Sequence, residues 1–122
     1  MDHKEIKKEA VRLLERLPEE FRSRLSNVEI VVEKRAKRNQ LKAMGLDPQQ
    51  DTLYGLYEGT PLPERSALEP PLLPDKITIF SEPLLRDFPN PSELRKQIRL
   101  TLLHEIAHYF GMDEEEIEDL GY

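Results

Sequence analysis

Two histidines that stand four residues apart in an apolar stretch constrain this chain more than any other feature. The stretch, residues 101–114, reads TLLHEIAHYFGMDE and contains His104 and His108. Its apolar residues predict a buried helix. Because positions i and i+4 lie on one face of a helix, both imidazoles can bind the same metal ion. Glu105 lies beside that ion, where a general base for an activated water is expected.

A catalytic zinc ion takes three protein ligands and leaves its fourth position to water. Gly111 can end the helix in a left-handed conformation and turn the chain back. Glu114, three residues later, is the predicted third ligand, and Asp113 is its rival. We favour Glu114 because Asp113 suits the N-cap of a last helix, with Glu116 at the N3 position. The predicted cofactor is one Zn²⁺ ion held by the two histidines and Glu114.

The C-terminal run as a whole resembles the small bacterial zincin-like metallopeptidases. Their pattern is HExxHxxGxx followed by Asp or Glu, and HEIAHYFGMDE at 104–114 matches it. Two upstream stretches are also similar: LYGLYEG at 53–59, followed by PLPER at 61–65, and ITIF at 77–80. The resemblance implies a minimal zincin fold and a zinc-dependent peptidase of unspecified substrate. Metzincin proteases share part of the motif, but their third ligand is a histidine.

The sequence leaves several functional roles open. Peptide hydrolysis needs a group that stabilises the oxyanion, and Tyr57, Tyr109 and Tyr122 are equal candidates. A zinc-stabilised binding domain without turnover is an alternative function, in which a fourth protein ligand replaces the water. A metal-free interaction module that uses the basic cluster KRAKR at 34–38 is another. Such a charge run is also typical of a solvated helix face.

Composition narrows the choice of ligands and partners. The length predicts one domain, residues 1–122. Cysteine is absent, so only His, Asp and Glu can hold a metal. Residues 46–122 carry a net charge of −10 against +4 for residues 1–45, so nucleic acid is not an expected partner. Without a membrane span or signal-peptide pattern, we expect a cytoplasmic protein with a peptide or protein substrate.

The predicted fold class is α+β, a minimal zincin-like fold in which a small mixed three-stranded sheet packs against helices that include the motif helix. Predicted strands cover 28–33, 53–57 and 76–80. Strand 53–57 is either an edge strand that pairs with substrate or an ordinary internal strand. Predicted helices cover 3–17, 19–25, a segment that ends at Met44, 82–88, a long helix from Ser92, and 114–120. Phe21 and Leu25 are expected to face the core and His3 the solvent, and the five prolines of residues 59–74 predict a loop.

Overall fold

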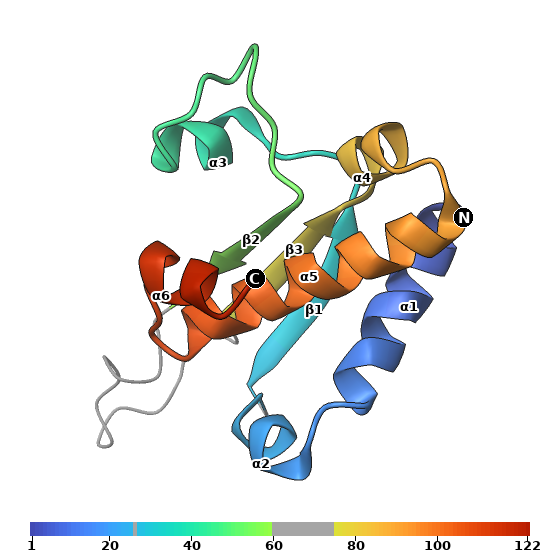
Figure 1. The fold of residues 1–122 in the computed structure, drawn as a ribbon. Helices are drawn as coiled ribbons and strands as arrows, with labels where there is room; N and C mark the ends of the chain where they lie inside the picture. Colours follow the sequence, from blue (N-terminus) through green and yellow to red (C-terminus); the bar gives the residue numbers. More distant parts are fainter. Residues whose placement is uncertain (26, 60–74) are drawn as a thin grey trace.

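The fold is built on a mixed three-stranded sheet with strand order β1-β3-β2. The computed structural model describes residues 1–25, 27–59 and 75–122. The strands are β1 (Val28–Glu33), β2 (Gly55–Glu58) and β3 (Asp75–Phe80). β1 runs parallel to β3, and β2 runs antiparallel to it (Figure 1). The predicted α+β class and mixed sheet are confirmed, and β2 lies at an edge of the sheet.

Two helices cover one face of the sheet. The long helix α5 (Pro91–Tyr109) packs against β2 and β3, and α1 (His3–Glu15) packs against β1 and α5 (Figure 1). Shorter helices connect these elements or follow them: α2 (Glu19–Arg22), the 3-10 helix η1 (Ser23–Leu25), α3 (Arg38–Ala43), α4 (Ser81–Asp87) and α6 (Glu114–Asp119).

The core lies between the sheet and these two helices. Alternate residues of a strand share one face, so Ile77 and Ile79 of β3 both point into it. The long helix contributes four apolar side chains at helical spacing, namely Leu94, Ile98, Leu102 and Ile106. Helix α1 contributes Ile6 and Ala10. Each of these side chains is at most 5% exposed. The packing fixes the position of α5, and so of the two motif histidines on it.

The long helix begins one residue earlier than predicted. Asn90 is the N-cap, and its Oδ1 accepts hydrogen bonds from the N–H groups of Ser92 and Glu93 at 2.9 and 3.3 Å. Pro91 occupies the first helical position, where a missing N–H costs nothing and the fixed φ suits the helix. The prediction that Ser92 opens the helix was therefore wrong.

Two predicted exposures were also wrong. Phe21 is 40% exposed and contacts the ring of Phe110 at a centroid distance of 6.0 Å, whereas Leu25 is buried as expected. His3 is half-buried, because its Nδ1 lies 2.8 Å from Oγ of the buried Ser81.

Part of the predicted proline-rich loop, residues 60–74, lies outside the described residues. Within the described ranges, none of the helices combines the length and the apolar character needed to cross a lipid bilayer.

Candidate metal centre

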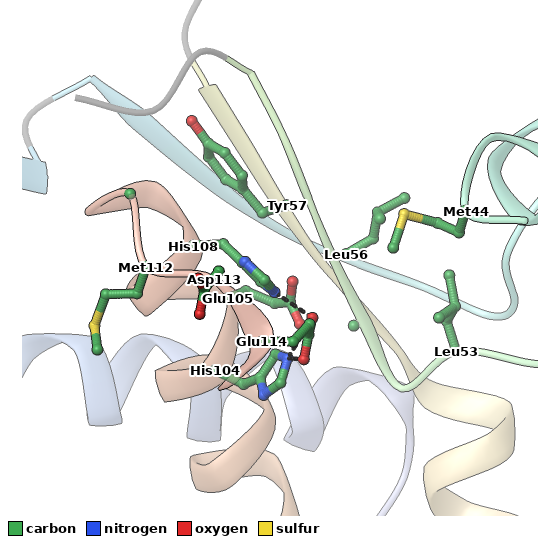
Figure 2. A pocket seen from close by; sticks show the side chains of 12 residues that line it. Met44, Leu53, Leu56, Tyr57, His104, Glu105, His108, Met112, Asp113 and Glu114 are labelled. Atoms are coloured by element: carbon green, nitrogen blue, oxygen red, sulfur yellow. Dashed lines mark hydrogen bonds and ion pairs between the residues drawn. The ribbon is translucent and has the colours of Figure 1, made fainter. Parts of the chain in front are cut away.

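His104 and His108 lie on consecutive turns of α5 and face the same cleft. Their ring centroids are 5.0 Å apart, as the spacing predicts for one helix face. Their side chains are 25% and 24% exposed, so solvent reaches both rings. Figure 2 shows the two imidazoles converging on the carboxylate of Glu114.

Gly111 turns the chain back at the end of α5, as predicted. Its φ is +88°, a left-handed value that favours glycine. The N–H of Gly111 donates to the carbonyl of His108 at 2.9 Å, and that of Met112 donates to Ala107 at 3.1 Å. This pair of bonds is the Schellman motif, which satisfies the last carbonyls of a helix and reverses the chain. As a result α6 begins next to the histidines.

The first turn of α6 presents Glu114 to both imidazoles. Asp113 is the N-cap: its Oδ1 accepts from the N–H of Glu116 at 2.9 Å, and Oε1 of Glu116 accepts from the N–H of Asp113 at 3.3 Å. The predicted capping box is therefore confirmed. With Asp113 engaged in this way, the neighbouring Glu114 carboxylate lies 2.8 Å from Nε2 of His108 and 3.2 Å from Nε2 of His104.

The three side chains fit a divalent cation. Each offers one ligand atom, and these atoms lie within 4.8 Å of one another. Ligands at about 2.0–2.2 Å from one zinc ion, in tetrahedral arrangement, are separated by about 3.3–3.5 Å. The observed nitrogen–oxygen distances of 2.8–3.4 Å lie close to that spacing. A metal can therefore bind here with small side-chain adjustments, and neutral imidazole with carboxylate is a donor set that zinc accepts.

Glu105 is buried beside this group and is not the surface carboxylate that its charge alone suggests. It is 7% exposed. Burial raises the pKa of its carboxyl above the ordinary value, and the Glu114 carboxylate reinforces the shift. The imidazoles of His104 and His108 and a hydrogen bond from the backbone of Tyr57 act on this pKa in the opposite direction. The Glu105 carboxyl is thus held between α5 and β2.

Gly55 on β2 allows this close approach of strand and helix. A Cβ atom at Gly55 would lie 2.6 Å from Cγ2 of Thr101 and 3.3 Å from Cγ of Glu105. Both distances are shorter than ordinary van der Waals contacts. A glycine inside a strand indicates either a bulge or close backbone approach, and here the glycine packs closely against the α5 side chains.

The candidate ligands line an open cleft of about 560 Å³. One wall consists of α5, the Gly111 turn and the start of α6, and the other consists of β2 and the segment before it (Figure 2). Met44, Leu53 and Leu56 line the second wall. Leu53 and Leu56 belong to the stretch 53–57, one interpretation of which was a strand that pairs with substrate. Met44 was not expected at the site, because it approaches the cleft only through the packing of α3.

The three tyrosines considered for the oxyanion occupy different surroundings. The Tyr109 hydroxyl donates to the carbonyl of Arg24 at 2.6 Å in the core, so it is directed away from the cleft. Tyr57 lines the cleft, but its hydroxyl donates to Oδ2 of Asp75 at 2.5 Å. The side chain of Tyr122 lines a separate apolar groove between α1 and α5. None of these positions identifies an oxyanion-stabilising hydroxyl.

The backbone of Tyr122 does reach the site. Gly121 ends α6 with φ +89°, and a second Schellman pair follows: Gly121 N–H to Glu118 O at 2.9 Å and Tyr122 N–H to Ile117 O at 3.2 Å. This turn places the carbonyl oxygen of Tyr122 3.4 Å from Nδ1 of His104. A metal-binding histidine commonly donates its other ring N–H to such an acceptor.

The basic cluster at 34–38 lies elsewhere on the surface. Four of its five residues are exposed, and Arg35 approaches Glu82 at 3.9 Å. This exposure agrees with a solvated charged segment, and none of the five lines the cleft.

Comparison with known proteins points in the same direction as the geometry. Residues 25–122 match a family described as zincin-like metallopeptidase. The match includes the whole sheet and the candidate metal centre, and it begins after α1 and α2. No curated protein has a significant sequence match to the chain.

Proposed function

The chain belongs to the zincin-like metallopeptidase family, and we propose that it hydrolyses peptide bonds with one bound zinc ion. One observation carries the proposal: His104, His108 and Glu114 meet in an open cleft, with a buried carboxylate beside them. Two imidazoles and one carboxylate with access for solvent form the ligand set of a catalytic zinc site.

In this proposal Nε2 of each histidine and a carboxylate oxygen of Glu114 hold the zinc. When bound, zinc polarises a carbonyl as a Lewis acid and lowers the pKa of water. Glu105 accepts a proton from the attacking water on its carboxylate and later donates that proton to the leaving amine nitrogen. Because burial raises the pKa of its carboxyl, Glu105 binds a proton more readily than a solvated carboxylate does.

An extended peptide bound along β2 is the substrate geometry that fits the cleft. The N–H of Phe80 donates to the carbonyl of Tyr54 at 2.9 Å, so alternate residues from Tyr54 onward turn their main chain toward β3. Gly55 therefore turns its N–H and C=O toward the open edge, whereas the N–H of Tyr57 on the same side is already hydrogen-bonded to Glu105. Strand addition at such an edge obtains its affinity from main-chain hydrogen bonds. The carboxylates along the cleft disfavour nucleic acid as the partner.

The alternative of a zinc-stabilised domain without turnover receives no support from the ligand set. A structural zinc site is closed by a fourth protein ligand. Within the part of the chain that the structure describes, the potential metal-binding group at this point has three members.

The proposal is tested with Glu105→Gln, a change that keeps size and hydrogen-bonding capacity but removes the base. Zinc content is measured by elemental analysis, and hydrolysis with a library of fluorogenic peptides. We expect the variant to retain zinc and to lose about 10²–10⁴ in kcat, the usual contribution of a general base.

Glu93→Gln is the matched control, because it makes the same change in the exposed first turn of the same helix. It should leave both zinc content and hydrolysis unchanged. Zinc-loaded wild-type protein that cleaves no peptide in the library, or a Glu105→Gln variant as active as wild type, would contradict the proposal.

A further inference from the structure

One large apolar side chain in the cleft is exposed without an evident structural reason. Met44, at the C-cap of α3, is 51% exposed, and it lines the same cleft as the histidines. Leu53 is half-buried and Leu56 is 6% exposed, and both line the same wall. Figure 2 shows Met44, Leu53 and Leu56 grouped together, apart from the imidazoles. They form an apolar cluster beside the candidate metal centre.

The alternation of side chains along β2 separates Leu56 from the residues that face the catalytic groups. A Cβ at Gly55 would meet α5, and the Tyr57 ring lies 6.0 Å from that of Tyr109, so both residues face α5. Leu56 stands between them and therefore points to the other face of the strand. In a peptide paired with β2, the residue opposite Leu56 directs its side chain to that same face. That side chain then reaches the apolar cluster.

We propose that Met44, Leu53 and Leu56 form a subsite that selects peptides with a large apolar side chain near the cleaved bond. The inference rests on the proposed function, because it assumes that the peptide lies along β2. Met44 is the adjustable part of the subsite: it is the most exposed of the three, and an unbranched thioether side chain adapts to different apolar partners.

The expected difference in affinity between peptides follows from the burial of one peptide side chain in this subsite. Moving a leucine side chain from water into an apolar site favours binding by roughly tenfold to a hundredfold. A charged side chain gains nothing there and loses hydration. Peptides that differ only at the residue opposite Leu56 should therefore differ in affinity by about that factor.

The test measures binding separately from hydrolysis. Fluorescently labelled short peptides, which carry one Leu, Glu or Lys at each position in turn, are titrated against zinc-loaded Glu105→Gln protein by fluorescence polarisation. We expect one position at which Leu binds roughly tenfold to a hundredfold more tightly than Glu. Adding Met44→Glu should reduce that preference to a few-fold or less, and Met44→Ala should reduce it partially. Val11→Glu is the control, because Val11 is a 38% exposed apolar residue on α1 outside the cleft.

The outcomes separate this inference from the peptidase proposal. A Leu preference that disappears in Met44→Glu and persists in Val11→Glu supports the subsite, even if zinc-loaded wild type cleaves none of the peptides. Equal affinity for Leu, Glu and Lys at every position overturns it, as does a preference that Met44→Glu leaves unchanged or an absence of binding by all peptides. Because Met44 is half-exposed, its variants should melt at the temperature of the parent protein, and thermal unfolding checks this.

Discussion

Gly55→Ala introduces a single methyl group at the contact between β2 and α5. The new Cβ would lie 2.6 Å from Cγ2 of Thr101, whereas ordinary contacts begin at 3.4 Å, so the Thr101 side chain must rotate or strand and helix must separate by roughly 0.8 Å. Overpacking of this kind costs about 1–3 kcal/mol, and loss of glycine flexibility in the unfolded chain returns about 0.4–1 kcal/mol. We expect a net loss of about 1–2 kcal/mol and a melting temperature lower by about 3–10 °C.

Thr101→Ser gives the matched second arm of a double-mutant cycle, because it deletes the Cγ2 atom that the new methyl group would meet. In the Gly55→Ala/Thr101→Ser protein the short contact is absent, although Glu105 Cγ and the Thr78 carbonyl oxygen remain at 3.3 Å. Denaturant unfolding of the four proteins should give a favourable coupling free energy of about 1 kcal/mol or more. Strictly additive effects, or a Gly55→Ala protein as stable as wild type, would show that the contact is not as described.

Two further predictions concern the candidate site. Because the folded-state pKa of Glu105 is raised, the stability that this carboxyl contributes to the metal-free protein is fully present below about pH 4.5 and is lost as pH rises through the folded-state pKa. In EDTA, Glu105→Gln should therefore melt above wild type near pH 7.5 and equally near pH 4; a pH-independent difference refutes this. Gly121→Ala and Gly45→Ala both place alanine at a positive φ in open space, at +89° and +74°, so both should be destabilised. Only Gly121→Ala should weaken zinc binding, by about tenfold in a chelator competition assay, because only that turn positions the Tyr122 carbonyl at His104; equal zinc affinity in the two variants would contradict it.

The sequence predicted best those features that depend on neighbouring residues. The β-branched run at 28–33 forms β1 with the predicted bounds. The helix with its two histidines, the left-handed Gly111 and the capping box at Asp113 all follow from local geometry, and together they bring Glu114 to the imidazoles. The assignment of these residues as zinc ligands, and of Glu105 as the base, stays a prediction.

Features that depend on contacts between distant segments were not predictable in this way. In the sequence, Tyr109 and Tyr57 were equal candidates for stabilising the oxyanion. In the structure the Tyr109 hydroxyl donates a hydrogen bond to the carbonyl of Arg24, 85 positions away in the chain. Met44 reaches the cleft because α3 ends beside β2, a relation that no periodic pattern encodes. His3 is half-buried because Ser81 lies next to it in the fold. In each case the partner is selected by tertiary packing and not by local propensity.

The candidate ligands and the candidate base are positioned by different parts of the chain, so mutations can affect one without the other. The candidate ligands are positioned by α5, the Gly111 turn and the cap of α6, all within one continuous stretch. Glu105 is held instead from across the cleft, by the backbone of Tyr57 and by the close packing of Gly55. Changes in β2 should therefore disturb the base while zinc remains bound, and changes in the turns around α6 should disturb zinc binding first. A Gly55→Ala protein that retains zinc but hydrolyses peptides more slowly would display this division directly, since a displacement of about 1 Å at a catalytic group is enough to reduce the rate by roughly 10²-fold.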